Sequence, residues 1–169
     1  MTTDLRDVRQ AGKIIQFEED TVGFGPLPES INALLQRGVV AYRSGREEAE
    51  RLFAQALIED PAQLPAYYCL YKIYTYQGRL DEAESAAEAG LKEAARQAGW
   101  EPDIESWSVP EGPLEGPARF ALYTLKALAF INLKKGSQEK ARRYLARLSE
   151  LDPDGQTGWT VIQALAEGL

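Results

Sequence analysis

The stretch Ala66-Tyr-Tyr-Cys-Leu-Tyr-Lys-Ile-Tyr-Thr-Tyr-Gln-Gly78, followed at once by Leu80-Asp-Glu-Ala83, decides the fold. Apolar residues recur at helical spacing on both sides of Gly78, which predicts two helices joined by a turn. Glycine suits the end of the first helix because it adopts a left-handed backbone conformation without strain. Acidic residues directly after the turn favour the start of the second helix. The stretch is therefore expected to form a helix-turn-helix unit.

Two further stretches have the same layout. One begins with Gly38-Val-Val-Ala-Tyr-Arg-Ser-Gly45, and the other with Leu125-Lys-Ala-Leu-Ala-Phe-Ile-Asn-Leu-Lys-Lys-Gly136. In both, a second apolar-periodic helix follows the glycine and ends at Asp-Pro, because proline cannot continue the hydrogen-bond ladder. The sequence thus predicts helix pairs over residues 31–63, 64–97 and 117–153, and a last, unpaired helix over 156–167. Residues 1–29 are expected to form an N-terminal arm.

These stretches resemble the tetratricopeptide repeat, a helix-turn-helix unit of about 34 residues. In the middle stretch, Tyr67, Leu70, Tyr74 and Ala83 match its signature positions. Ala49 and Phe53 match in the first stretch, and Ala141 and Leu145 in the third. The resemblance implies an all-α, right-handed solenoid of about seven helices over residues 30–169, formed by antiparallel helix pairs and closed by a capping helix.

Composition narrows the function. The net charge is −7, which argues against nucleic acid and anionic membranes as partners. The chain has no histidine and one cysteine, Cys69, so zinc sites of the usual Cys/His type and Ser-His or Cys-His nucleophiles are excluded. No apolar run reaches the ~18 residues of a membrane span, and the N-terminus lacks the layout of a signal peptide. We therefore expect a cytoplasmic protein that is not an enzyme and needs no cofactor or metal.

Charges are unevenly shared between the predicted helices. The first helix of each pair has no acidic residue over residues 31–44, 64–77 and 117–135, whereas the second helices of the first two pairs are rich in Asp and Glu. The resemblance implies that the first helices line a concave groove, which would then be basic and aromatic. The residues predicted to line it are Leu35, Val39, Tyr42, Arg43, Tyr68, Lys72, Tyr76, Tyr123, Lys126, Phe130 and Lys134. Packing between helices is the alternative explanation for the aromatic residues.

An insertion at residues 98–116 separates the second and third pairs. It contains Trp100 and Trp107, several prolines and five acidic residues, and no basic residue. One hypothesis is that it lies along the groove and adds Trp107 to the binding surface or covers the groove until a partner arrives. The alternative is a surface loop whose tryptophans pack onto neighbouring helices.

A basic, aromatic groove suits a partner segment that carries apolar anchors and carboxylates. We therefore expect a non-catalytic interaction module, a chaperone-like or accessory and assembly factor that binds another protein. The size, acidity and repeats also resemble the tetratricopeptide chaperones of type III secretion, and more weakly the small accessory proteins that associate with nitrogenase. An enzyme is the alternative from another class.

Overall fold

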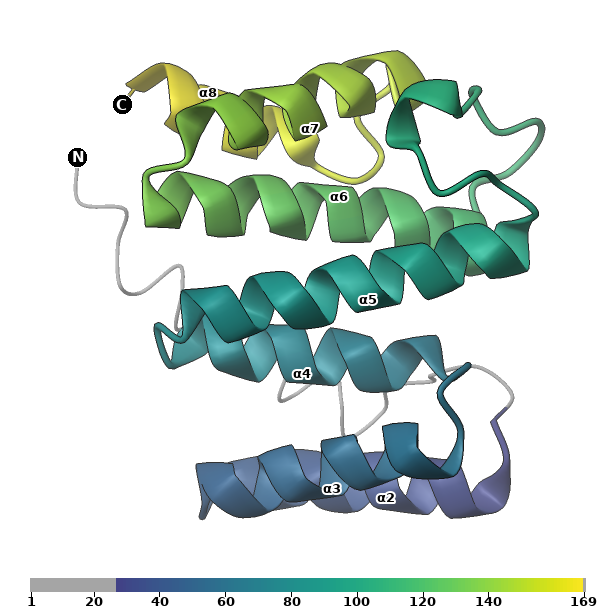
Figure 1. The fold of residues 1–169 in the computed structure, drawn as a ribbon, viewed down its shortest axis with the longest axis vertical. Coiled ribbons are helices and arrows are strands. Elements are labelled where there is room, and N and C mark those ends of the chain that lie inside the picture. Colours follow the sequence, from purple (N-terminus) through teal and green to yellow (C-terminus); the bar gives the residue numbers. More distant parts are fainter. Residues whose placement is uncertain (1–26, 169) are drawn as a thin grey trace. The chain divides into compact units, whose positions relative to one another are not determined.

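The computed structural model describes residues 27–168, so the predicted arm lies outside the described residues except for its last three (Figure 1). Every regular element in this range is a helix, and neighbouring helices pack in adjacent pairs. The prediction of an all-α, solenoid-like fold is thereby confirmed. The chain divides into two compact units between Gly78 and Arg79, inside the second predicted helix pair.

The first unit contains three helices, α2 (Glu29–Tyr42), α3 (Arg46–Glu59) and α4 (Leu64–Tyr76). Helices α2 and α3 pack closely along a seam where Gly38 faces Phe53. A Cβ atom at residue 38 would lie 2.4 Å from a carbon of the Phe53 ring, so only glycine fits against it. Helix α4 packs against α3, and the Tyr74 hydroxyl donates a 2.9 Å hydrogen bond to the carboxylate of Glu50.

The second unit contains α5 (Leu80–Ala98), the short 3-10 helix η1 (Ile104–Ser106), α6 (Gly116–Lys135), α7 (Gln138–Leu151) and α8 (Trp159–Gly168). Helix α6 packs against α5 on one side and α7 on the other, as Figure 1 shows. Helix α8 packs against both α7 and α6. Almost every large side chain that faces inward from α6 is fully buried, including Leu122, Leu125 and Leu128.

The predicted turn glycines have two different roles. Gly136 ends α6 with a φ of +82°, and Gly78 follows α4 with a φ of +71°, so both take the expected left-handed conformation. Gly45 differs, because its φ of −167° is ordinary extended backbone at the start of α3. The prediction of a left-handed helix end was wrong there, since α2 closes through residues of right-handed helical conformation.

Small residues lie at three positions where the sequence resembles the tetratricopeptide signature. Ala49, Ala83 and Ala141 are all fully buried. A methyl side chain at such a position lets the neighbouring helix approach closely. None of the described helices is long and apolar enough to cross a membrane.

Candidate functional site

Helix α6 carries a line of alternating cationic and aromatic side chains along one face. It consists of Arg119, Tyr123, Lys126, Phe130 and Lys134, which we call the α6 stripe. Steps of three or four residues place all five on the same side of a helix. Tyr123, Lys126 and Phe130, in the middle of the stripe, are half-buried. Arg119 and Lys134, at its two ends, are exposed. Four of these five residues were predicted site residues, and the structure places all four on one face of the same helix.

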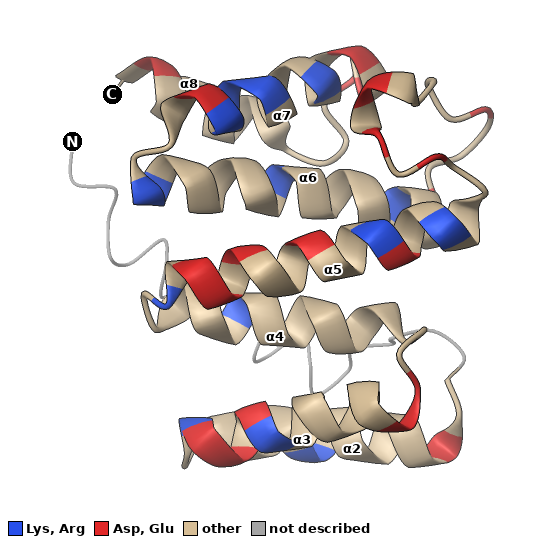
Figure 2. Cartoon of the chain, viewed as in Figure 1, with Lys and Arg blue, Asp and Glu red and all other residues tan. Residues whose placement is uncertain are grey.

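Each cation of the stripe lies beside an aromatic ring. The Lys126 ammonium is 5.4 Å from the centre of the Tyr123 ring, and the Lys134 ammonium is 5.3 Å from that of Phe130. The Arg119 guanidinium lies 4.7 Å from the centre of the Tyr123 ring. Such cation-π contacts hold a charge near an apolar surface without neutralising it. In Figure 2, α6 carries blue Lys and Arg segments and no red segment.

Part of the α6 stripe is bound by the loop between α7 and α8. The Lys126 ammonium donates a 2.7 Å hydrogen bond to the carbonyl oxygen of Thr157, and the Tyr123 hydroxyl donates one of 3.1 Å to the carbonyl oxygen of Gln156. Burial lowers the pKa of Lys126, because a charged ammonium loses hydration there. Lys126 and Tyr123 therefore hold the fold together as well as lining the stripe.

The carboxylate of Asp152 shapes this loop from within. Asp152 is buried, and its oxygens accept hydrogen bonds from the backbone N–H groups of Gln156 and Thr157, both at 2.9 Å, and from the Thr157 hydroxyl at 2.8 Å. Its own carbonyl oxygen accepts a 2.7 Å hydrogen bond from the indole N–H of Trp159. The backbone carbonyls that reach Tyr123 and Lys126 are positioned by this turn.

Helix α4 of the first unit repeats the motif on a smaller scale. The predicted site residues Tyr68, Lys72 and Tyr76 lie four residues apart and are half-buried. The Lys72 ammonium is 5.5 Å from the centre of the Tyr68 ring, and that ring also packs edge-on against Tyr71. Both helices thus pair an aromatic ring with a lysine within one turn, on a helix without acidic residues.

Leu35 and Val39 do not line an exposed surface. Their side chains are 0% and 4% exposed, and they belong to the buried face of α2 together with Ile31 and Gly38. The expectation that these two side chains face an open groove was wrong. Because Gly38 lies against Phe53, this face of α2 is buried in the core. The repeat pattern alone did not show which face of α2 is buried.

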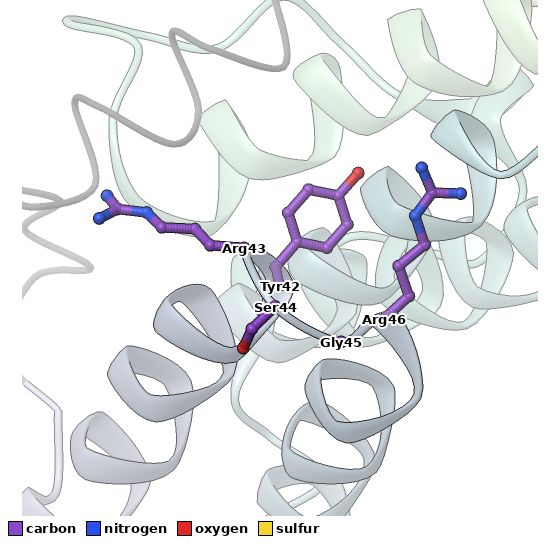
Figure 3. A pocket seen from close by; sticks show the side chains of 5 residues that line it. All are labelled: Tyr42, Arg43, Ser44, Gly45 and Arg46. Carbon is purple, nitrogen blue, oxygen red and sulfur yellow. The ribbon is translucent and has the colours of Figure 1, made fainter.

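Tyr42 and Arg43, the remaining predicted residues of the first unit, lie at the α2–α3 turn. With Ser44, Gly45 and Arg46 they line an open depression of about 490 Å³. Figure 3 shows the Arg43 and Arg46 side chains extending to opposite sides, with the Tyr42 ring between them. The two guanidinium groups do not converge, so the depression does not form a built anion site.

The insertion packs onto α7. Trp107 is buried, its ring lies 4.8 Å from that of Trp100, and its indole N–H donates to the carbonyl oxygen of Glu101 at 2.7 Å. The buried guanidinium of Arg147 on α7 donates to the carbonyl oxygens of Ile104 at 3.0 Å and Trp107 at 2.7 Å. These contacts agree with the alternative in which the tryptophans pack down. The prediction that Trp107 offers an exposed binding surface was wrong.

An ion-pair network joins α5 to α6 and α7. The Lys135 ammonium lies 2.7 Å from a carboxylate oxygen of Asp81 and 3.3 Å from one of Glu84, and Lys140 lies 3.5 Å from Glu84. Burial alone would raise the pKa of Glu84, but hydrogen bonds from Lys135 and Asn132, together with the charge of Lys140, lower it. Lys135 therefore serves the packing of α5, whereas its neighbour Lys134 belongs to the α6 stripe.

Sequence reasoning missed three residues of this region as site or framework residues. Arg119 lies four residues before Tyr123, so helical spacing could have placed it on the same face of α6. Asp152 looked only like a helix stop, and nothing in the sequence marked Arg147. Among residues 27–168, no group of three or more Cys, Asp or Glu side chains is arranged to hold a metal ion.

Comparison of the chain with protein-family models found no match, and comparisons with curated proteins and with solved structures found none either.

Proposed function

We propose that this chain is a non-catalytic, tetratricopeptide-like interaction module that binds an acidic and apolar segment of another protein, in the manner of a chaperone or an assembly factor. The observation that supports the proposal is the α6 stripe. It offers aromatic surface and positive charge side by side on a helix that has no acidic residue from Gly116 to Lys135. Aromatic side chains give a large contact area at low entropic cost, and cations at the rim attract carboxylates.

The α4 residues Tyr68 and Lys72 support the same proposal from the first unit. They give the chain a further aromatic-cation pair, 5.5 Å apart, on another helix with no acidic residue. The insertion does not compete for this role, because its acidic residues Asp103 and Glu105 pair with Arg143 on α7. Among residues 27–168, neither of these two acidic residues pairs with Arg119 or Lys134 of the α6 stripe.

A peptide selection tests this function directly. A random peptide library is selected on the wild-type protein, and the best binders are measured by fluorescence anisotropy. We expect them to be rich in Asp, Glu and large apolar residues. Arg119→Glu with Lys134→Glu should weaken their binding roughly tenfold or more, since two attractive charges become repulsive. Lys126 is left unchanged, because its ammonium also holds the α7–α8 loop.

The matched control reverses the same two residue types elsewhere in the second unit. Lys92→Glu and Arg142→Glu change exposed side chains on α5 and α7, so the total charge change is equal. The control should bind the selected peptides within about twofold of wild type. Selected peptides that are predominantly basic, or that bind the stripe variant and the control equally, would refute the proposed function.

A further inference from the structure

The two lysines of the α6 stripe differ in one respect. Lys126 lies over Tyr123 and has an acceptor, the carbonyl oxygen of Thr157 at 2.7 Å. Lys134 lies at nearly the same distance from its ring, Phe130, yet among the described residues it has no hydrogen-bond acceptor and no ion-pair partner. We call Tyr123 and Lys126 the filled pair, because the lysine has an acceptor. We call Phe130 and Lys134 the open pair.

In the filled pair, both side chains donate hydrogen bonds to the α7–α8 loop. Asp152 fixes the loop through three hydrogen bonds of 2.8 to 2.9 Å, and Gly158 lies so close that a Cβ atom there would be 3.5 Å from the Lys126 ammonium. A partner would have to break this turn to reach Lys126. The loop therefore covers this part of the stripe and leaves the part toward the C-terminus of α6 for a ligand.

No acidic side chain among the described residues forms an ion pair with Lys134. Lys135 forms the ion pairs with Asp81 and Glu84 on α5, whereas Lys134 is exposed and takes part in neither. Phe130 is half-buried, and the centre of its ring lies 5.3 Å from the exposed Lys134 ammonium. An ammonium next to an aromatic face recognises a carboxylate that is adjacent to an apolar side chain.

We propose that Phe130 and Lys134 form the anchoring subsite of the α6 stripe, and that they bind a carboxylate and a neighbouring apolar side chain of the partner segment. The inference rests on the proposed function and makes it specific. The carbonyl oxygens of Gln156 and Thr157 already occupy Tyr123 and Lys126. Of the two aromatic-lysine pairs on α6, only Phe130 and Lys134 are therefore left to anchor the partner, and Arg119 at the other end of the stripe contributes charge.

Nuclear magnetic resonance of the full chain tests this subsite. The probe is a synthetic peptide built from repeats of Leu-Glu-Phe-Asp, and its neutral counterpart is built from Leu-Gln-Phe-Asn. We expect the acidic peptide to shift the Phe130 ring and Lys134 side-chain resonances while leaving the Lys126 ammonium signal in place. The neutral peptide should bind several-fold more weakly, because it cannot form the charged contact.

Three variants separate the possible outcomes. Lys134→Gln and Phe130→Ala should each weaken binding of the acidic peptide roughly threefold to tenfold, whereas Lys92→Gln, an exposed lysine on α5, should leave it unchanged. Binding that ignores Lys134→Gln but shifts Tyr68 and Lys72 on α4 would overturn this subsite and preserve the proposed function. Absence of binding by the acidic peptide to the wild type would count against both.

Discussion

The guanidinium of Arg147 on α7 donates a 2.7 Å hydrogen bond to the carbonyl oxygen of Trp107, forty positions earlier in the chain. A second hydrogen bond, of 3.0 Å, reaches the carbonyl oxygen of Ile104. The side chain of Arg147 is only 10% exposed, so both hydrogen bonds are shielded from water. This one side chain fixes the path of the insertion across α7.

Removing this guanidinium should destabilise the second unit. Arg147→Ala leaves two carbonyl oxygens without their donors, and we expect the free energy of unfolding to fall by about 2–4 kcal/mol in urea titrations followed by tryptophan fluorescence. Arg143→Ala is the matched control, because its pair with Glu105 is exposed and is worth less than about 1 kcal/mol. Equal effects of the two changes would show that Arg147 is not the anchor.

The seam between α2 and α3 should reject any side chain at residue 38. Gly38→Ala places a Cβ atom 2.4 Å from the Phe53 ring, and relieving that overlap should cost about 1–3 kcal/mol of stability. Gly45→Ala is the control, because a Cβ atom there meets nothing within 4 Å. Calorimetry should also show that the additional change Phe53→Leu costs less in the Gly38→Ala background than alone, since the smaller residue makes room.

The contribution of Glu84 should depend on pH. Its pKa is lowered in the folded protein from an ordinary value of 4.5, so its ionised form stabilises the fold above that value. The stabilisation is lost as the pH falls through the lowered pKa. We expect Glu84→Gln to cost about 1 kcal/mol at neutral pH and progressively less as the pH falls below 4.5 and through the lowered pKa, as measured by urea unfolding.

Glu101→Gln is the control for this pH series, because the Glu101 side chain is exposed and forms no ion pair among residues 27–168. Its effect should be small at every pH. A cost of Glu84→Gln that stays constant down to pH 3 would mean that ionisation of Glu84 is not the source of the stabilisation.

Asp152 should control both the α7–α8 loop and the titration of Lys126. Asp152→Ala removes three hydrogen bonds to residues 156 and 157, at a cost of roughly 2 kcal/mol, and should speed amide exchange at both positions. Loosening the loop hydrates the Lys126 ammonium, so its lowered pKa should rise toward the ordinary value of 10.5. Both effects are measurable by nuclear magnetic resonance.

Asp154→Ala is the matched control for the loop. Asp154 lies in the same turn, but its side chain is exposed. The control should leave amide exchange at Thr157 and the pKa of Lys126 unchanged. A Lys126 pKa that does not move in Asp152→Ala would separate the loop from the burial of this lysine.

The helices were predictable because their signals are local. Periodic apolar residues, the turn at Gly136 and the stop before Pro153 each act within a few residues, and the structure ends α6 and α7 there. The α6 stripe was predictable for the same reason, since helical spacing alone puts Tyr123 and Phe130 on one face. The choice of which face each helix buries is not local, and there the prediction failed for Leu35 and Val39.

The packing of the insertion could not be predicted for a different reason. The two hydrogen bonds from Arg147 to the insertion end on main-chain oxygens, which every residue carries, so no particular partner residue signals them. The same holds for Lys126 and the carbonyl oxygen of Thr157. Contacts of a side chain with a distant backbone leave no complementary pattern in the sequence, and they determine how much of the α6 stripe stays open.

That kind of contact also bears on how this protein would diverge. Arg147 holds the insertion mainly through two backbone oxygens, besides its pair with Glu105 and its pair with Glu150 on the same helix. It therefore constrains the course of the insertion and permits wide change in exposed side chains such as those of Glu111 and Glu115. Distant relatives are then better recognised by an arginine on the helix that corresponds to α7, packed against a long connection between two earlier helices. Similarity of residues within that connection would be a poor guide to common ancestry.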